Sequence, residues 1–286
     1  MIPDSQTNKV YFSDLLPKRF PALVADLTRH LERAGVAIGY IQGTRDIWCR
    51  DYMPVQVDVG RFVQFRYQPD YLRDDADSIT PPEVCRRIPE IEHCVESDIV
   101  LDGGNVVHWA DKAIMTDKIY RENPGYRRPA LRKKLKDLLG LDELIIIPQE
   151  PEEALGHADG VVRFIDADRV LVNDYSQVDP DYGARLLRVL RRAGLECVEI
   201  TYAPNLRSRA KIPPASGCYT NFLRVQGAVI IPVFLFPEDE IAVDCVRAAH
   251  LSERVVVVDA HAIAKEGGIL NCATWSITIG NESELC

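Results

Sequence analysis

The sequence predicts a single α/β domain over residues 1–286, arranged as a five-bladed α/β propeller with approximate internal symmetry. Two observations predict this fold. A unit made of a helix, an apolar strand, a polar segment and a β-hairpin recurs about every fifty to sixty residues. No linker, low-complexity tract or shift in composition divides the chain. An open, doubly wound sheet is the alternative, but its crossovers would return directly to a parallel strand and leave no place for the hairpins.

Proline and glycine mark the ends of the predicted helices, because proline suits the first helical position and glycine suits the left-handed residue after the last one. The predicted helices run from Pro21 to Gly35, from Pro129 to Gly140, from Pro180 to Gly194, and onward from Pro237. In the last of these we expect Ile241, Cys245 and Ala248 to form the apolar face. A shorter helix is predicted between Pro82 and Pro89.

Each helix is followed by a short run of β-branched residues, which predicts a buried strand. These runs cover 36–41, 98–101, 143–147, 196–200 and 254–258. Hairpins with short polar turns follow, with strands at 55–57 and 62–65, 106–109 and 113–115, 161–165 and 170–172, and 222–225 and 229–231. The fifth unit keeps one strand, 273–279, and we expect the N-terminal stretch around Val10-Tyr11-Phe12 to pair with it.

Composition excludes several classes of protein. The net charge of -9, from 43 acids and 34 bases, argues against nucleic-acid binding, which needs a basic surface. No apolar stretch reaches the ~20 residues that span a bilayer. The start of the chain resembles no signal peptide, and the eight cysteines, Cys286 included, form no C-x-x-C pair, so we expect reduced thiols, a cytoplasmic protein and no structural zinc. The acidic stretch 68–78 is expected to be an exposed loop.

The polar segment between strand and hairpin carries unusual residues in every unit. These segments are 46–54, 102–105, 156–160, 216–221 and 266–272. If the units surround an axis, the segments all face it, and six polar side chains that are distant in sequence meet there. They are Asp51, Asp102, His157, Asp159, Asn221 and Cys272. Taken alone, Cys272 would more often be a small buried residue and His157 a core histidine; their recurrence at equivalent points favours catalysis.

This set of side chains suits a guanidinium substrate. A guanidinium is a planar cation whose N–H donors match carboxylates bidentately, so Asp51 and Asp159 could clamp its edges and hold its carbon over the Cys272 sulfur. The thiolate would attack that carbon, with its pKa lowered by His157 or by the substrate. His157, oriented by Asp102, would protonate the departing ammonia and then activate water. No metal or organic cofactor is required.

The same residues resemble the agmatine deiminase and bacterial (Porphyromonas-type) peptidylarginine deiminase family. The matching stretches are Trp48-Cys49-Arg50-Asp51 with Pro54, Asp102-Gly103-Gly104-Asn105, Gly156-His157-Ala158-Asp159-Gly160, Tyr219-Thr220-Asn221, and Gly267-Gly268 leading to Cys272. The resemblance implies the pentein-like propeller of guanidino-group modifying enzymes, a cysteine nucleophile, a histidine acid/base and guanidinium-binding acids. Of the matched residues, we expect Trp48, Asn105, Asn221 and Gly268 to contact the substrate.

Two departures from the family pattern bear on the substrate. Agmatine deiminases usually have glutamate before the paired glycines, where this chain has Asp102. They usually have a third glycine and a histidine just before the cysteine, where this chain has Ile269-Leu270-Asn271. Agmatine, free arginine, a protein arginine and other guanidines therefore remain open as the small cationic partner.

Three other functions use the same residues. A cysteine peptidase or amidase needs one orienting acid and an oxyanion hole, so the additional acids Asp51 and Asp159 count against it. An amidinotransferase would pass the amidino group to an amine instead of water, which residue types do not distinguish. A non-catalytic binder of cationic ligands is the fourth hypothesis, and the altered stretch before Cys272 keeps it open.

Overall fold

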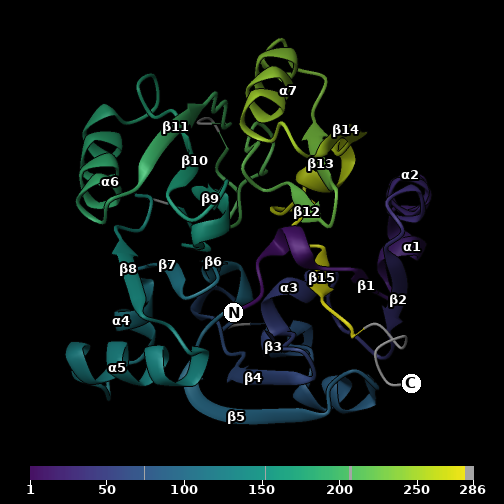
Figure 1. Ribbon diagram of the computed structural model, residues 1–286, viewed down its shortest axis with the longest axis vertical. Helices are drawn as coiled ribbons and strands as arrows, with labels where there is room; N and C mark the ends of the chain where they lie inside the picture. The colour runs from purple at the N-terminus through teal and green to yellow at the C-terminus, as the bar shows by residue number, and fades with distance from the viewer. Residues whose placement is uncertain (74, 152, 206–207, 281–286) are drawn as a thin grey trace.

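The computed structural model describes residues 1–73, 75–151, 153–205 and 208–280 (Figure 1). Its strands form five three-stranded sheets. In each sheet an antiparallel pair is extended by a parallel third strand. The sheets are β15 (Thr274–Ile277), β1 (Lys9–Ser13) and β2 (Ala37–Ile41); β3 (Val55–Asp58), β4 (Arg61–Arg66) and β5 (His93–Val100); β6 (Val107–Trp109), β7 (Lys112–Thr116) and β8 (Glu143–Ile147); β9 (Val162–Phe164), β10 (Arg169–Asn173) and β11 (Glu196–Ile200); and β12 (Leu223–Val225), β13 (Ala228–Val233) and β14 (Arg254–Asp259).

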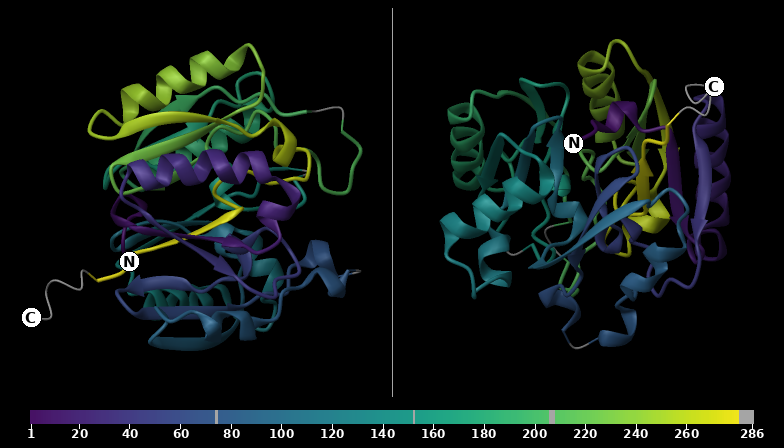
Figure 2. Two further views of the ribbon diagram at one scale, coloured as in Figure 1. Left: turned by 90° about the vertical axis from the view of Figure 1, so that its right-hand side faces the viewer. Right: turned by 60° about the horizontal axis from the view of Figure 1, so that its bottom comes forward.

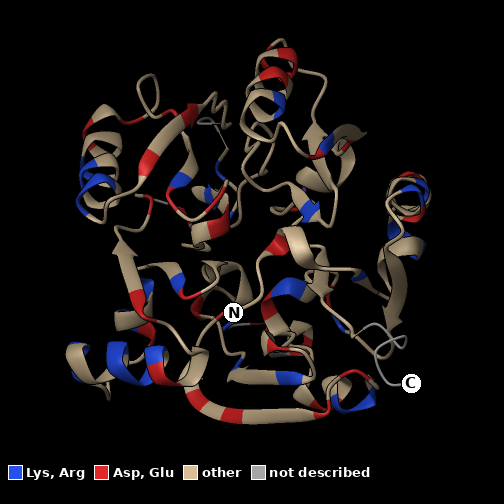
Figure 3. Cartoon of the chain, in the orientation of Figure 1, with Lys and Arg blue, Asp and Glu red and all other residues tan. Residues whose placement is uncertain are grey.

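The longer helices lie at the periphery of the molecule, and the first strands of the hairpins lie toward its middle (Figure 1). The α-helices are α1 (Leu16–Arg19), α2 (Pro21–Arg33), α3 (Cys49–Tyr52), α4 (Lys118–Glu122), α5 (Arg128–Leu139), α6 (Pro180–Arg192), α7 (Glu238–Ala249) and α8 (His261–Ala264). The 3₁₀ turns are Asp4–Gln6, Asp70–Leu72, Ala76–Ser78, Pro82–Arg87, Gly103–Asn105 and Ala158–Gly160. Lys and Arg are prominent on α5 and α6, while β5 and α7 carry several acids (Figure 3).

The two ends of the described chain are joined in one sheet, as the sequence predicts. β1 pairs antiparallel with β15, with Tyr11 opposite Trp275 and Phe12 opposite Thr274. The other edge of β1 pairs in parallel with β2. The N-terminal strand thereby completes the fifth unit, which has only one strand of its own after α8.

Most element positions agree with the sequence prediction. α2, α5 and α6 begin within one residue of the predicted prolines. α5 ends at Leu139, directly before Gly140, whose φ of 64° places it in the left-handed region that favours glycine. β8 and β11 begin and end at the predicted residues. The segment predicted as a short helix near Pro82 is a 3₁₀ helix that ends at Arg87.

Two predictions about burial are wrong. The strands predicted as buried are mostly sheet-edge strands with exposed residues: β2, β5, β11 and β14 each bury few side chains, and only β8 is largely buried. A β-branched run indicates a strand, but it does not say whether both faces are covered. In α7 the buried residues are Ala242, Val243 and Val246, while Ile241 is 63% exposed, because the helix presents a different face to the sheet than the predicted one.

The hydrophobic core lies between the sheets and the helices that cover them. One cluster joins Phe12 of β1, Leu27 of α2, Ile230 of β13 and Val246 of α7. This packing holds the helices outside and leaves the polar segments that precede the hairpins at the middle of the molecule. In the described part of the chain, no helix is long and apolar enough to cross a membrane. The seven described cysteines are free thiols, and Cys286 lies outside the described residues.

Candidate active site

The polar segments of the units meet at the middle of the fold. α3 carries Asp51, and its neighbour Arg50 donates its backbone N–H to the carbonyl of Cys272 over 3.1 Å. Asp51 in turn accepts the backbone N–H of Gly104 over 2.9 Å. His157 lies against the acids of both segments. The structure therefore confirms that segments distant in the sequence converge on one place.

His157 lies between two carboxylates. Its Nε2 is 2.8 Å from Oδ2 of Asp102, and its Nδ1 is 3.6 Å from Oδ1 of Asp51. Burial opposes a charge on the ring, but the two carboxylates outweigh it and raise the pKa of His157 to about 9. Burial also raises the pKa of Asp51 to about 7, with Asp102 and Asp159 adding to the effect and His157 opposing it. His157 is therefore an imidazolium at neutral pH, ready to give a proton.

Asp102 is held from its other side by a buried lysine. Lys118, at the start of α4, places Nζ 2.8 Å from Oδ2 of Asp102 and 3.2 Å from Oε1 of Glu122. Burial disfavours the charge on Asp102, but Lys118 and His157 outweigh it and lower the pKa of this carboxyl group. Despite burial, Asp102 and Glu122 raise the pKa of Lys118. Asp102 is thus an ionised anchor that fixes His157 through Nε2.

The sequence predicts an exposed loop over 68–78, but some described residues of this stretch are buried. Leu72 is buried, and Tyr71 places its ring edge-on to the His157 imidazole with ring centroids 6.1 Å apart. The Nζ atom of Lys118 lies 4.9 Å from the centre of the same tyrosine ring. The Tyr71 ring therefore lies against both His157 and Lys118, which an acidic composition does not reveal.

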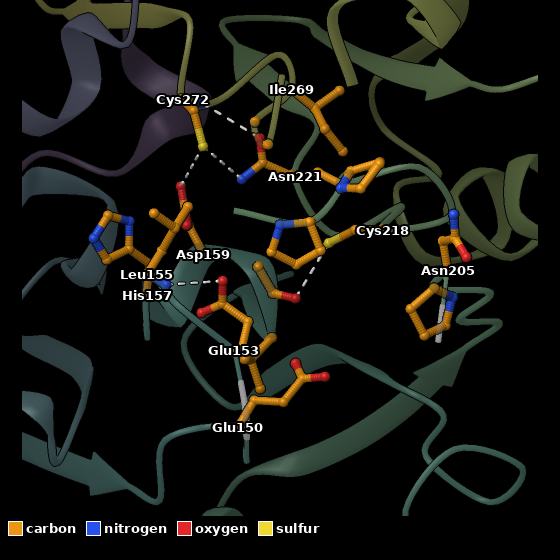
Figure 4. Close-up of a pocket in the computed structure, with 18 of the residues that line it drawn as sticks. Glu150, Glu153, Leu155, His157, Asp159, Asn205, Cys218, Asn221, Ile269 and Cys272 are labelled. Atoms are coloured by element: carbon orange, nitrogen blue, oxygen red, sulfur yellow. Dashed lines mark hydrogen bonds between the residues drawn. The ribbon is translucent and has the colours of Figure 1, made fainter. Parts of the chain in front are cut away.

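Cys272 is positioned by Asn221 from the neighbouring unit. The Asn221 amide donates to Sγ over 3.3 Å, and its carbonyl accepts the backbone N–H of Cys272 over 3.3 Å (Figure 4). Sγ also lies 3.7 Å from Oδ2 of Asp159. Burial, together with the charges of Asp159 and Asp51, raises the pKa of the Cys272 thiol well above its usual range. In the free protein this thiol is therefore protonated.

The altered stretch before the cysteine belongs to the site. Asn271 donates to Oδ2 of Asp159 over 2.6 Å, which orients the carboxylate nearest the sulfur. Ile269 lines the cavity beside it. The residues that depart from the family pattern thus contact the same acid and the same cavity as the matched residues do.

Paired glycines leave room for the charged cluster. A Cβ on Gly104 would lie 2.8 Å from Oδ1 of Asp51 and 2.8 Å from Nδ1 of His157. A Cβ on Gly103 would lie 2.0 Å from the carbonyl oxygen of Arg50. Glycine is required at both positions because a backbone passes directly over the side chains of the site.

A cavity of about 240 Å³ opens beside these groups. Among the residues predicted to act in the site, His157, Asp159, Asn221, Gly268 and Cys272 line it. The loop between β11 and β12 forms part of its wall, and this loop projects from the same side of the molecule as the segment between β4 and β5 (Figure 2).

The other predicted site residues do not line the cavity; they are Asp51, Asp102, Trp48 and Asn105. Asp51 and Asp102 contact His157, and the Trp48 ring packs against Gly268, where an added Cβ would come within 2.6 Å. Asn105 accepts the backbone N–H groups of Thr116 and Ala158, at 2.9 and 3.2 Å, and so supports the turn after His157. Direct substrate contacts of Asp51, Trp48 and Asn105 stay predictions of the sequence. Within the described ranges, no cluster of His, Cys, Asp and Glu is arranged to hold a metal.

Sequence analysis missed four residues of this site. Lys118, Tyr71 and Asn271 support the acids or the histidine, and Glu150 lines the far end of the cavity. Only the i,i+4 spacing of Lys118 and Glu122 could have pointed to one of them, and that spacing is common on exposed helices.

Comparison with known proteins identifies the family. Residues 21–277 match the family model of Porphyromonas-type peptidyl-arginine deiminases. The chain belongs to this family. Among curated relatives, the agmatine deiminase of Ectopseudomonas mendocina is 27% identical over 280 residues, which cover 81% of this chain and 74% of that protein. The agmatine deiminase of Stutzerimonas stutzeri is 28% identical, with 72% of this chain and 63% of that protein covered.

Solved structures show the same fold at low sequence identity. The agmatine deiminase of C. jejuni superposes with a TM-score of 0.79 at 18% identity, over 98% of this chain and 96% of that chain. A more distant similarity links this chain to the enzyme named DDAH from Pseudomonas aeruginosa, with a TM-score of 0.58 at 14% identity, over 95% of this chain and 100% of that chain. Both of these proteins therefore share the arrangement of elements seen in this chain.

Proposed function

We propose that this chain is a deiminase, a hydrolase that cleaves a C–N bond of a guanidinium group in agmatine or an arginine-like substrate. One observation carries the proposal. The Cys272 sulfur, the Asp159 carboxylate 3.7 Å from it and the protonated ring of His157 line one cavity. A nucleophile, an acid and an anionic binding group for a flat cation are thus available together.

Substrate binding prepares the nucleophile. A guanidinium that pairs with Asp159 brings a positive charge next to Sγ, and this charge lowers the raised pKa of the Cys272 thiol, so that its proton leaves to solvent. The N–H of the Asn221 amide, 3.3 Å from Sγ, stabilises the resulting thiolate. Asp51 contributes negative charge from behind His157, which favours the bound cation.

The chemistry then proceeds in two steps. The Cys272 sulfur forms a bond to the guanidinium carbon, and the C–N bond to one terminal nitrogen breaks as His157 gives its proton to the departing ammonia. The neutral ring next removes a proton from water, which attacks the amidino-thioether carbon. The C–S bond breaks as the added hydroxyl loses its proton to solvent, which releases a neutral ureido product and restores the thiolate. Asp102, itself paired with Lys118, keeps the ring in place throughout.

The surroundings of Cys272 favour this reaction over peptide or amide hydrolysis. Peptidases direct hydrogen-bond donors at a developing oxyanion. Here the nearest polar groups to the sulfur include the carboxylate of Asp159, which would repel an oxyanion and attract a cation. Transfer of the amidino group to an amine instead of water remains the second candidate, since both reactions share the first step.

Product analysis tests the proposal. The protein is incubated with agmatine, arginine and an arginyl peptide, and both ammonia and the ureido product are measured. We expect turnover of at least one compound, and we expect Cys272→Ala to abolish it. Cys94→Ala is the matched control, because Cys94 is an exposed cysteine on β5. Undiminished turnover by Cys272→Ala would refute the mechanism, and product formed only when an amine is added would indicate a transferase.

We also propose an architecture for the domain and a location in the cell. The five three-stranded sheets, with the end strands β1 and β15 paired, support a five-bladed α/β propeller that forms one domain over residues 1–286. A cytoplasmic location and the absence of a cofactor stay predictions of the sequence.

A further inference from the structure

The short helix α3 lies beside β15, the strand that follows the turn carrying Cys272 (Figure 1). α3 and the residue before it contain the motif Trp48-Cys49-Arg50-Asp51. The tryptophan of this motif packs on Gly268, and the aspartate lies 3.6 Å from His157. The side chains of its two middle residues have no part in the proposed reaction, yet both of them contact the Cys272 turn.

Three successive carbonyl groups of the turn accept hydrogen bonds from Cys49 and Arg50. Arg50 Nε donates to the carbonyl of Asn271 over 3.4 Å, and the Arg50 backbone N–H donates to the carbonyl of Cys272 over 3.1 Å. The Cys49 thiol donates to the carbonyl of Ala273 over 3.3 Å. Burial raises the pKa of Cys49 to about 12, so this thiol keeps the proton that it donates. One turn of helix therefore holds the backbone on both sides of the nucleophile.

The Arg50 guanidinium also connects the turn to the strand that follows it. Its Nη2 donates to Oγ of Ser276 over 3.0 Å, and Ser276 lies on β15, where the pairing with β1 fixes its register opposite Val10. A planar guanidinium presents its donors at fixed relative positions, so this one side chain sets the separation between Asn271 and Ser276. Cys272 lies between these two contacts in the sequence.

The peptide group between Asn271 and Cys272 is held at both of its ends. Its carbonyl accepts from Arg50, and its N–H, which belongs to Cys272, donates to the side-chain carbonyl of Asn221 over 3.3 Å. Because a peptide group is planar and rigid, fixing both ends also fixes the direction in which the Cys272 side chain leaves the backbone. A rotation of this plane would move Sγ away from the Asp159 carboxylate, from which it now lies 3.7 Å.

Arg50 acts from outside the cavity in which we propose that the substrate binds. Among the described residues, Arg50 is not part of the wall that His157, Asp159 and Cys272 line. It lines a separate cavity of about 20 Å³ together with Ser276. A space of that size holds about one water molecule and no guanidine. The Arg50 side chain therefore reaches the reaction only through the turn that it holds.

From these contacts we infer that Arg50 is a positioning residue for the nucleophile: its guanidinium holds the peptide between Asn271 and Cys272 in the orientation that directs Sγ at the carbon to be attacked. The inference rests on the proposed function and adds to it a residue that does not touch the reacting atoms. A reacting atom misplaced by about 1 Å costs about 100-fold in rate, so Arg50 should matter far more for the chemical step than for binding.

Two variants of Arg50 test the inference in steady-state kinetics, with the guanidine that the wild type turns over fastest as substrate. Arg50→Met keeps the alkyl stem and removes every side-chain donor, and we expect kcat to fall about 100-fold. Arg50→Lys keeps the charge, but its single ammonium cannot hold Asn271 and Ser276 together. We expect its kcat to lie about tenfold above that of Arg50→Met, the size expected of one regained hydrogen bond. Arg29→Met, at an exposed arginine of α2 that pairs with Asp26, is the matched control and should keep the wild-type kcat.

Binding is measured separately in Cys272→Ala, which holds the substrate without consuming it. Adding Arg50→Met to this variant should raise the dissociation constant by less than about tenfold, the effect expected if the Asn271 side chain lost its hydrogen bond to Asp159. A loss of kcat without an equal loss of affinity is the result expected of a misplaced nucleophile. Thermal unfolding shows which variants are folded at the assay temperature.

Two results would overturn the inference. If folded Arg50→Met keeps the wild-type kcat, Arg50 only supports the fold. If its affinity falls by the same factor as kcat, Arg50 supports the binding site and not the nucleophile. Should Arg50→Met fail to fold, the same measurements on Arg50→Lys decide, because a kcat about tenfold below wild type with retained affinity supports the inference and an unchanged kcat overturns it.

Failure of the proposed function is a separate outcome. If the wild type turns over no guanidine at all, the deiminase proposal fails, and the crystal structure of the folded Arg50 variant then tests the contact by itself. A peptide between Asn271 and Cys272 that rotates, with Sγ displaced from Asp159, supports the role of Arg50 in holding the turn. A peptide and a sulfur that stay in place overturn it.

Discussion

Replacing Lys118, the buried lysine that pairs with Asp102 beside His157, gives a quantitative test of the charge network. Lys118 is fully buried and contacts Asp102 at 2.8 Å and Glu122 at 3.2 Å. Lys118→Met keeps most of the side-chain volume but leaves Glu122 without its cation and leaves Asp102 with His157 as its remaining cationic partner. Removing one partner of a buried ion pair costs about 3–5 kcal/mol, because the remaining charge is desolvated and uncompensated. We expect Lys118→Met to lose that amount of unfolding free energy at pH 7.

The pH dependence of this loss is a second consequence. The lysine and His157 lower the pKa of Asp102 in the folded protein. A carboxyl group with a lowered folded pKa stabilises the fold above its unfolded pKa, and that contribution is lost as the pH falls through the folded value. Without Lys118 the folded pKa of Asp102 rises, so acid protonates a carboxylate that has lost one of its two cationic partners. The difference between wild type and Lys118→Met should therefore be largest near neutral pH and shrink toward pH 4.

Denaturant unfolding at a series of pH values measures this difference, and Lys133→Met provides the control. Lys133 lies on α5 with its side chain 77% exposed and pairs with Asp137 at the surface. Exposed pairs contribute about 0–1 kcal/mol, so the control should unfold almost like the wild type. If Lys118→Met is as stable as Lys133→Met at pH 7, the account of Asp102 as an ionised anchor is wrong.

Three further predictions concern activity. If His157 is the acid that we propose, with its pKa raised to about 9, kcat/KM should fall as the pH rises through that value. Asp51→Asn, which removes a carboxylate that raises this pKa, should move the fall to lower pH in a pH–rate profile. Gly104→Ala should abolish turnover with the circular dichroism spectrum unchanged, whereas Gly125→Ala, whose added Cβ meets nothing within 4 Å, should behave as wild type. Asn271→Ala removes the hydrogen bond that orients the Asp159 carboxylate and should raise KM about tenfold in steady-state kinetics. An unchanged KM would show that this hydrogen bond does not contribute to substrate binding.

The convergence of the site could be predicted because the repeat carries it. Asp102, His157 and Cys272 occupy the same place in the second, third and fifth units, so similar local structure brings them to the middle of the fold. The pairing of β1 with β15 could also be predicted from the repeat, because the fifth unit lacks one strand and the N-terminal strand supplies it.

Other features depend on packing that a single sequence does not encode locally. Lys118 has the sequence context of a surface helix residue, and it becomes the partner of Asp102 only because the fold brings the start of α4 beside this carboxylate. Which face of α7 is buried depends on the angle at which the helix meets the sheet, and Ile241 and Val243 are both apolar. The acidic stretch near Tyr71 has a solvent-like composition, yet one ring of it covers His157.

The structure of Cys272→Ser with a bound guanidine substrate tests the central claim most directly, since this variant can bind the cation without consuming it. The account predicts the guanidinium carbon about 3–3.5 Å from the serine oxygen, with the Asp159 carboxylate paired to the N–H edge of the guanidinium. A guanidinium that binds away from Asp159, or with its carbon beyond reach of residue 272, would contradict the account.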